Sequence, residues 1–493
     1  MKTSENKVVK HSTIYMFGDI LRYSTSLIML PIYTRFLTPD DYGVIELLTM
    51  LIDFTALILG ARISVSVFRY YCTATNCTEK NNIISSALML GIFFNATGAA
   101  ILLLLSETLA IAIFSDASFQ YYIVIFAITM LLLPLIEVPL VHIRAQQKPW
   151  LFFYFSIAKL VLQVGLNIYF IVYLDMHVEG VAYSAAITSI VMATTLTGYS
   201  LSKTGMSASI ATCRKLFTFS LPLMLASLGT FYLTFGDRYI LSIYTDFTQV
   251  GIYALGYKFG FIFMILSWVP FEKIWDSEKY EIHKRPNAKA TYQSYFLYVN
   301  IILITLGLCI SLFIKDLIKI MADPAFLNAH QIVPIIILAF VLQAWTKFCD
   351  LGILLKKKTM QIAQAELIAV IVMSIAFFTL IPAYGFYGAA WSAVIGFGTK
   401  FYWTYIKAKK LYDMELPWFK VNLTVLLAIT FFLISLLIPD EIITSIALRL
   451  VLISAFIAAF FALPIFSQDE KAKIMQSILT IKNHPLFSSR INK

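Results

Sequence analysis

Charge is scarce in this chain of 493 residues, since Asp, Glu, Lys and Arg together make up 13% of it. Soluble globular domains carry about a quarter of their residues as charged groups, so this composition excludes a large soluble domain. Cysteine is also rare, with five residues, and the six histidines show no spacing typical of a metal site or an activated nucleophile. The sequence therefore predicts no metal, no cofactor and no enzymatic chemistry.

Apolar residues, in contrast, make up 59% of the chain, and the mean hydropathy is +0.80. Apolar runs of about 20 residues, enough for one helix to cross a bilayer, fill almost the whole sequence. Open strands leave unpaired backbone groups in hydrocarbon, so we expect an all-α polytopic membrane protein. The fourteen predicted spans are 11–36, 42–64, 82–105, 119–142, 150–174, 178–201, 215–236, 247–270, 292–314, 331–355, 360–382, 386–408, 418–438 and 442–466.

The basic residues predict how these spans are oriented. If the N-terminus is inside, 28 of the 38 Lys and Arg residues fall in internal segments and 4 in external ones. Lys and Arg favour the cytoplasmic side of a membrane, so both termini are predicted to be cytoplasmic. The same asymmetry accounts for the net charge of +10, and nucleic acid is not an expected partner.

Three short segments recur in the same order, 208 residues apart, which indicates a duplicated unit. The pairs are Gly43-Val44-Ile45 with Gly251-Ile252-Tyr253, Lys148 with Lys356, and Gly180-Val181-Ala182-Tyr183-Ser184-Ala185 with Gly388-Ala389-Ala390-Trp391-Ser392-Ala393. Both copies begin on the same side of the membrane, so the repeats are parallel. The predicted parts are an N-terminal six-helix lobe at 1–208, a C-terminal six-helix lobe at 209–412, and a helix pair with a basic tail at 413–493.

Six basic residues fall inside predicted spans, where each costs about 2.5–3.5 kcal/mol at a span centre. They are Arg22, Lys159, Lys258, Lys347, Lys400 and Arg449. Structural ion pairing inside the bundle is one explanation, and a polar cavity with an anionic substrate is the other. We predict that Arg22, Lys159, Lys258 and Lys400 line such a cavity, and that Arg449 lies away from it.

Two of these cations have an acid one helical turn away, because Asp19 precedes Arg22 and Asp350 follows Lys347 by three residues. Residues at this spacing share one helix face and can form an ion pair. Structural pairing is therefore expected for these groups, with a role in ion coupling as the alternative.

Other acids have no base on their own helix. Glu46 and Asp53 are seven residues apart on one face of a predicted span. They either pair with a cation of another helix or take up a coupling cation. Asp237 and Arg238 lie at the predicted external end of a span, where they form a gate or an ion pair that fixes the helix end.

The longest internal loop, about 271–291, carries mixed charge beside Trp275 and is predicted to form an amphipathic surface helix. Trp268 and Trp275 are expected near the membrane interface.

Several segments resemble the bacterial polysaccharide and O-antigen flippases of the multidrug/oligosaccharidyl-lipid/polysaccharide exporter superfamily. They are Ser12-Thr13-Ile14-Tyr15, the run from Leu30 to Gly43, Leu221-Pro222-Leu223, Asp237-Arg238-Tyr239-Ile240-Leu241, Val250-Gly251-Ile252-Tyr253, and the run from Tyr384 to Trp391. The resemblance implies a V-shaped transporter with two lobes around a central cavity in the bacterial cytoplasmic (inner) membrane. It further implies that Arg22 binds a pyrophosphate and that the last helix pair lines a groove for a lipid tail.

The resemblance also implies the substrate, a polyprenyl-pyrophosphate-linked oligosaccharide of the O-antigen, lipopolysaccharide, capsule or exopolysaccharide type. It would pass from the inner to the outer leaflet by alternating access. Expected partners are this lipid-linked oligosaccharide, membrane lipids and other membrane proteins of polysaccharide assembly. No nucleotide-binding motif is present, so an ion gradient is the expected energy source, with Glu46 and Asp53 as coupling acids. The alternatives are a multidrug or other small-molecule antiporter and, with less support, a polysaccharide polymerase or ligase.

Overall fold

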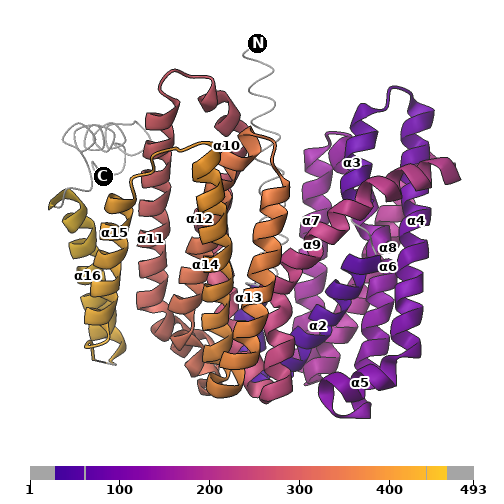
Figure 1. Cartoon of the computed structure of the whole chain (residues 1–493). Coiled ribbons are helices and arrows are strands. Elements are labelled where there is room, and N and C mark those ends of the chain that lie inside the picture. Colours follow the sequence, from indigo (N-terminus) through magenta and orange to yellow (C-terminus); the bar gives the residue numbers. More distant parts are fainter. Residues whose placement is uncertain (1–27, 60–62, 440, 463–493) are drawn as a thin grey trace, which may run out of the picture. The chain divides into compact units, whose positions relative to one another are not determined.

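The computed structural model describes residues 28–59, 63–439 and 441–462, and every regular element within these ranges is a helix (Figure 1). Residues 28–36 are helical. The elements that follow are α2 (Pro39–Leu59), α3 (Ile63–Thr73), α4 (Cys77–Leu104), α5 (Ser106–Phe114), η1 (Ala117–Phe119), α6 (Gln120–Ala145), α7 (Pro149–Asn167), η2 (Ile168–Tyr173), α8 (His177–Thr204), α9 (Ile210–Tyr244), α10 (Phe247–His283), α11 (Ala288–Met321), η3 (Pro324–Gln331), α12 (Val333–Leu355), α13 (Met360–Tyr384), α14 (Phe386–Leu411), α15 (Trp418–Ser435) and α16 (Ile442–Ala462). The prediction of an all-α polytopic protein is confirmed.

Ten of the described helices are long and apolar enough to cross a membrane, or eleven if the bent helix α9 counts as one span. These ten correspond to ten of the fourteen predicted spans. Of the other four, 11–36 lies mostly outside the described residues, and 386–408 forms α14, which carries several lysines. In α16 the apolar helix is short, Thr444–Phe460. The count of fourteen is therefore not confirmed.

Helix α9 bends by 44° between its segments Ile210–Leu225 and Ser227–Tyr244. Pro222 lies inside the helix one turn before the bend. A proline in a helix interior removes one backbone hydrogen bond and displaces the preceding turn, which is a common cause of kinks. The bend explains why the predicted span 215–236 is not one straight helix.

The start of α2 is fixed by a reciprocal pair of side-chain hydrogen bonds. The Asp41 N–H donates to Thr38 Oγ1 at 3.1 Å, and the Thr38 N–H donates to Asp41 Oδ2 at 3.0 Å. This is a capping box, with Pro39 at the first helical position, where its missing N–H costs nothing. The helix therefore begins three residues earlier than its predicted span.

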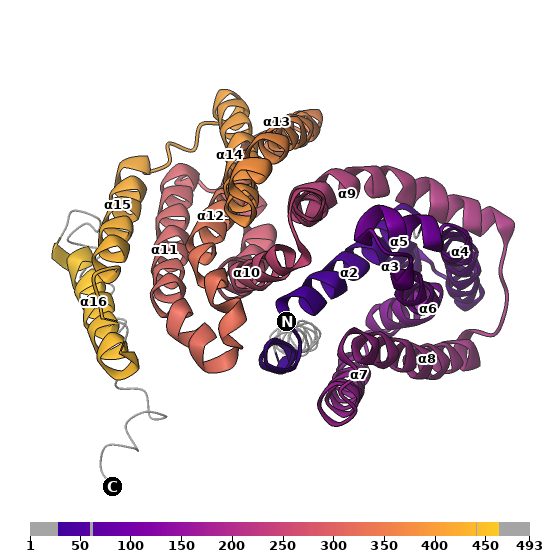
Figure 2. The same cartoon turned by 90° about the horizontal axis from the view of Figure 1, so that it is seen from below.

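The described chain forms two compact units, and the first takes the described residues up to Leu255 with Met321–Ala329 and Glu366–Gly396. In this unit α6 packs along both α4 and α8 (Figure 2). Its apolar contacts include a cluster around Val67, Ile84 and Leu216. The predicted division into lobes at 208 and 412 stays a prediction.

The second unit comprises Gly256–Ile320, His330–Ala365 and the described residues from Phe397 onward. Its core is rich in aromatic rings, and Trp275 stacks on Phe348 with ring centroids 4.2 Å apart. Trp268 and Trp275 are each 1% exposed. The helix predicted at 271–291 is present as far as His283, but it is the continuation of α10, and these two rings are buried.

The repeated glycine–serine motif has the same local structure in both copies. Ser184 donates its hydroxyl to the Gly180 carbonyl at 2.6 Å, and Ser392 donates to the Gly388 carbonyl at 2.7 Å. All four residues lie in the first turns of α8 and α14. This likeness supports the duplication read from the sequence.

The two basic loops of the repeat are also alike, at a slightly different offset. Gln147 and Lys357 both have φ near +55°, at 55° and 56°. The next residue in each loop donates its N–H five residues back, Lys148 to Ile143 and Lys358 to Ile353. Both helices thus end in a Schellman motif. By its structure Lys148 corresponds to Lys358, two residues beyond the sequence match at Lys356.

Candidate functional site

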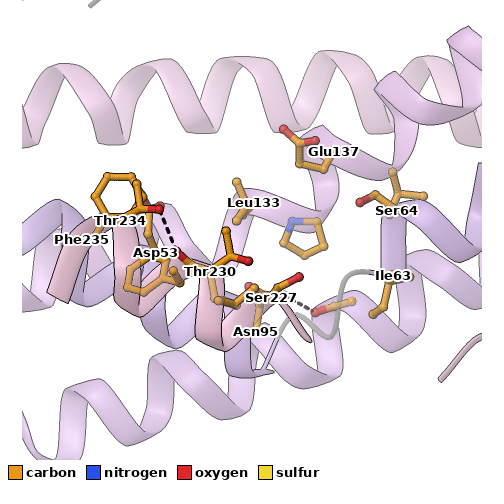
Figure 3. Close-up of a pocket in the computed structure, with 16 residues that line it drawn as sticks. Asp53, Ile63, Ser64, Asn95, Leu133, Glu137, Ser227, Thr230, Thr234 and Phe235 are labelled. Atoms are coloured by element: carbon orange, nitrogen blue, oxygen red, sulfur yellow. Dashed lines mark hydrogen bonds between the residues drawn. The ribbon is translucent and has the colours of Figure 1, made fainter. Parts of the chain in front are cut away.

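A cavity of about 400 Å³ lies in the first unit, between α2, α4, α6, α9 and the start of α3 (Figure 3). Many residues of its lining are polar, although the helices that carry them are mostly apolar. The polar residues of the lining are Asp53, Ser64, Asn95, Glu137, Ser227, Thr230 and Thr234. Polar groups within membrane spans are costly and mark functional positions, so this cavity is the leading candidate site among the described residues.

In the described lining, the hydrogen-bond donors of Thr230, Thr234 and Asn95 are directed to other groups of the protein. Thr230 donates to Glu366 Oε1 of α13 at 3.0 Å, and Thr234 donates to the Thr230 carbonyl at 2.7 Å. Asn95 uses its amide N–H on the Gly91 carbonyl at 2.9 Å. A ligand that offers hydroxyl groups, a proton or a cation would therefore complement this site.

Two acceptors in the lining have no partner within the part of the chain that the structure describes. Asn95 is 3% exposed, and its Oδ1 accepts no hydrogen bond there. Asp53 is exposed to the cavity and forms no hydrogen bond or ion pair with a described residue. In the view of Figure 3, Asp53 lies beside Thr230 and Thr234, while Glu137 lies toward the other end of the cavity.

A buried charge network adjoins the cavity where α9 continues beyond Thr234. Arg238 donates to Asp237 Oδ1 at 2.9 Å, and the Tyr253 hydroxyl of α10 donates to Asp237 Oδ2 at 2.5 Å. Arg238 Nε lies 3.8 Å from Glu46 Oε2 of α2. Asp237 is 0% and Arg238 2% exposed, so this pair is deep in the packing and ties three helices together.

The helices of this network cross at the repeated glycines. A Cβ at Gly43 would lie 2.2 Å from the Phe247 carbonyl oxygen, and one at Gly251 would lie 2.0 Å from that of Pro39. Only hydrogen fits at both positions. Beside the crossing, the Thr248 hydroxyl donates to Asp40 at 2.7 Å.

The predicted cavity cations that the structure describes do not gather at this site. Arg22 and its partner Asp19 lie outside the described residues. Lys159 of α7, Lys258 of α10 and Lys400 of α14 are half-buried, and none of them lines the cavity. The charged residues in its described lining are the acids.

Two other cations of the predicted spans, Lys347 and Arg449, form ion pairs. Lys347 donates to Glu272 of α10 at 2.7 Å, whereas the sequence pointed to Asp350, one turn further along α12. Arg449, expected to lie away from the cavity, is indeed not part of its lining and forms a buried ion pair with Asp316.

Sequence reasoning missed Asn95 and Thr230, which share the cavity with Asp53. A single amide or hydroxyl in an apolar span carries little signal, because it can bond to its own helix backbone. Glu137 lies inside the predicted span 119–142, but its place in this cavity follows from the packing of α6 against α4. Within the described residues, no group of three or more His, Cys, Asp or Glu side chains is placed to hold a metal ion.

Residues 8–271 match the family described as polysaccharide biosynthesis protein, which is more than half of the chain. The chain belongs to this family, and the resemblance to polysaccharide flippases is confirmed. All helices of the polar cavity, as well as the charge network, lie within the matched region. No curated protein sequence matches the chain.

Solved structures with the same fold are flippases and transporters. The lipid II flippase MurJ in an inward closed conformation has a TM-score of 0.72 at 12% identity, over 92% of this chain and 99% of its own. An inward-facing multidrug resistance transporter of the MATE family has a TM-score of 0.65 at 13% identity, over 80% of this chain and 98% of its own. At these identities the likeness concerns the fold alone.

Proposed function

We propose that this protein is a flippase that moves a polyprenyl-pyrophosphate-linked oligosaccharide from the inner to the outer leaflet of the bacterial cytoplasmic membrane. The observation that carries the proposal is a cavity rich in acceptor oxygens inside the region that matches the polysaccharide biosynthesis family. The oligosaccharide would be a repeat unit of O-antigen, capsule or exopolysaccharide. Its lipid tail stays in hydrocarbon, so the protein needs to supply a polar path for the headgroup only.

The chemistry of the lining suits a sugar better than it suits a phosphate. Sugar hydroxyls are donors, and Asp53 and Asn95 offer acceptors. A pyrophosphate needs cations instead. We therefore assign the sugars to this cavity, and we retain Arg22, Lys159, Lys258 and Lys400 as the proposed ligands of the pyrophosphate. In this proposal the sugars and the pyrophosphate of the headgroup bind to different sets of residues.

Asp53 is the acid best suited to couple transport to an ion gradient. Glu46, the other candidate, lies 3.8 Å from Arg238, so a fixed cation already stabilises its charge. Asp53 faces the cavity beside hydroxyl and amide oxygens, the ligand set of a proton or a hard monovalent cation. Lys347 and Asp350 are assigned to packing.

The network around Asp237 and Arg238 is proposed as a gate at the external end of the cavity. It joins α9 to α2 and α10 through buried charges, and a buried network of this kind has discrete made and broken states. Opening the gate would expose its charged side chains to water. Their hydration would then compensate for the ion pairs and hydrogen bonds that are lost.

A cationic small molecule is the second candidate substrate, because two carboxylates line the cavity. The multidrug resistance transporters of the MATE family share the fold. The two candidates differ in what the protein must recognise. A lipid-linked sugar offers neutral hydroxyls and a pyrophosphate, whereas a drug offers a positive charge.

The test is transport by the purified full chain in proteoliposomes without ATP. A lipid-linked oligosaccharide is placed in the membrane, and a membrane-impermeant glycosidase measures how much of its headgroup crosses between leaflets. In parallel, vesicles loaded with ethidium report cation export. We expect headgroup translocation above that of protein-free vesicles, and no ethidium export. Ethidium export without headgroup translocation would replace the flippase with the drug transporter.

A further inference from the structure

A carboxyl group of α13 is bonded to the wall of the polar cavity. Thr230 of α9 lines the cavity (Figure 3), and its hydroxyl donates to Glu366 Oε1 at 3.0 Å. Glu366 is half-buried and is not itself part of the described lining. Acids within membrane spans are costly and mark functional positions. Glu366 would therefore act on a ligand of the cavity through Thr230.

The local structure of α9 leaves room for this carboxyl group. A Cβ at Gly229 would lie 3.0 Å from Glu366 Cγ and 3.6 Å from its Oε1, so a larger residue there would press on the Glu366 side chain. Further along the same helices, the hydroxyls of Tyr232 and Ser374 are hydrogen-bonded at 2.7 Å. This second contact fixes α13 beside α9 and keeps the carboxyl group at Thr230.

The hydrogen bond to Glu366 decides how the Thr230 hydroxyl can serve a ligand. A hydroxyl has one proton to donate and two lone pairs that accept. The Thr230 proton is directed to Glu366, so its lone pairs remain for the cavity. Asn95 is committed in the same way, since its amide donates to the Gly91 carbonyl at 2.9 Å and its Oδ1 has no donor among the described residues. Both residues match a ligand group that donates.

This polarity separates a free sugar hydroxyl from a blocked one. A free hydroxyl can donate to Thr230, whereas an ether or ester oxygen in its place can only accept. Two acceptors that face each other share no proton, and a polar group that is desolvated without a partner lowers the affinity. The modification state of the sugar would thus be recognised at this wall of the cavity.

We infer that Glu366 is a specificity-determining residue of the flippase, a positioning residue that holds Thr230 as an acceptor for a free hydroxyl of the translocated sugar. The inference rests on the proposed function, and it narrows the substrate to a headgroup whose sugar is unmodified at that hydroxyl. Sugars that are O-methylated or O-acetylated there are disfavoured. Glu366 acts through Thr230 and not by its own contact with the sugar.

The test is the binding of two matched probes to the purified full chain in detergent, measured by native mass spectrometry. One probe is polyprenyl-pyrophosphate-linked N-acetylglucosamine, and the other carries the same sugar with its hydroxyls O-methylated. The unchanged protein should prefer the free sugar. In Glu366→Gln the new amide N–H can donate to Thr230, which releases the threonine proton toward the cavity. We expect the preference to fall about fivefold, the size of one hydrogen bond.

Further variants separate specificity from packing. Ser374→Ala is the matched control, because it removes a hydroxyl bond between α9 and α13 outside the cavity lining, and it should leave the preference unchanged. Thr230→Val should lower the preference as Glu366→Gln does, and the double variant should lower it no further. Thr230→Ser keeps the hydroxyl and should keep the preference.

Failure of the flippase function and failure of this inference give different results. If the unchanged protein binds neither probe, both are refuted. The inference alone is refuted if the unchanged protein binds both probes alike, if Glu366→Gln keeps the full preference, if Ser374→Ala loses as much of it, or if the losses in the double variant add. If Glu366→Gln does not fold, Thr230→Val and Thr230→Ser replace it, and an equal preference in these two refutes the inference.

Discussion

Glu46 and Asp53 lie on the same helix, yet their surroundings give them different chemistry. Glu46 is close to Arg238, 3.8 Å between the charged atoms. Asp53, two turns further along α2, faces the cavity with no partner among the described residues. A carboxylate held by a cation keeps its charge, whereas one without a fixed partner can exchange a proton or bind a cation. The proposed coupling role therefore falls to Asp53 rather than to Glu46.

We expect Asp53→Asn to keep the fold and lose the response to a gradient. The amide has nearly the size of the carboxylate, but it cannot carry the charge that a driving cation must balance. In proteoliposomes, headgroup translocation under an imposed proton or sodium gradient should fall to the rate measured with the gradient collapsed. Asp175→Asn, at an exposed position with φ of 52° that Asn tolerates, should leave the response unchanged. A full gradient response in Asp53→Asn would exclude this acid.

The buried pair of Asp237 and Arg238 leads to a second prediction at this scale. Arg238→Ala leaves Asp237 buried without its cation, so we expect a loss of about 3–5 kcal/mol in stability. The double variant with Asp237→Asn should recover much of it, because the amide needs no countercharge. Thermal unfolding of the single and double variants in detergent measures the effect. Additive losses would show that the two residues do not act as a pair.

At the scale of helices, the repeat has a specific structural use, because it places two glycines where α2 and α10 cross. Their backbones approach so closely that a methyl group at either position would overlap a carbonyl oxygen. Small residues allow such crossings in membrane proteins. The same two helices carry Glu46 and Tyr253 of the proposed gate, so this crossing also sets the spacing of the charge network.

We therefore expect Gly43→Ala and Gly251→Ala to destabilise the protein, each by about 1–3 kcal/mol, the range typical of overpacking. Gly198→Ala on α8 is the matched control, because nothing lies within 4 Å of a Cβ there. Alanine favours a helix over glycine by about 1 kcal/mol, so this control should be neutral or slightly stabilised. Midpoints of thermal unfolding compare the three, and equal midpoints would refute the close crossing.

The helices themselves were largely predictable from the sequence, since long apolar runs leave few alternatives in a membrane. The ends of helices were less so: Thr38 caps α2 by a pattern of local hydrogen bonds that hydropathy does not report. The cavity was only partly predictable. Asp53 stands out because a charge in an apolar span is rare, but the partner of Glu46 depends on how α2 packs against α9. Burial of Trp275 likewise follows from tertiary packing, which overrides its preference for the interface.

At the scale of the molecule, contacts within the first unit constrain the topology without reference to charge. The ring of Phe114, at the end of α5, lies 5.8 Å from that of Phe247, at the start of α10. Gln249 accepts a hydrogen bond from the Phe386 N–H, at the start of α14. The loops near residues 114, 247 and 385 must therefore lie on the same side of the membrane, since segments in contact cannot be separated by a bilayer.

His177 extends the same argument to one more loop, because its Nδ1 lies 3.4 Å from Asp41 at the start of α2. In the second unit, Lys289 pairs with Glu415 at 2.5 Å, so the loops near 285 and 413 also share a side. The contacts show which loops belong together, and the excess of internal Lys and Arg predicts that the first group is external and the second cytoplasmic.

Reporter fusions can test both statements at once. A reporter that is active only in the periplasm should be active after residues 110, 177, 244 and 384, and inactive after residues 285 and 413. A cytoplasmic reporter at the same positions is the control and should give the reverse. If reporter activity is reversed at every position, the pairing of loops holds, and the predicted orientation of the protein in the membrane is wrong. If the reporter is active after 110 and inactive after 244, two loops that touch in the structure would lie on opposite sides, and the packing of α5 against α10 would have to be abandoned.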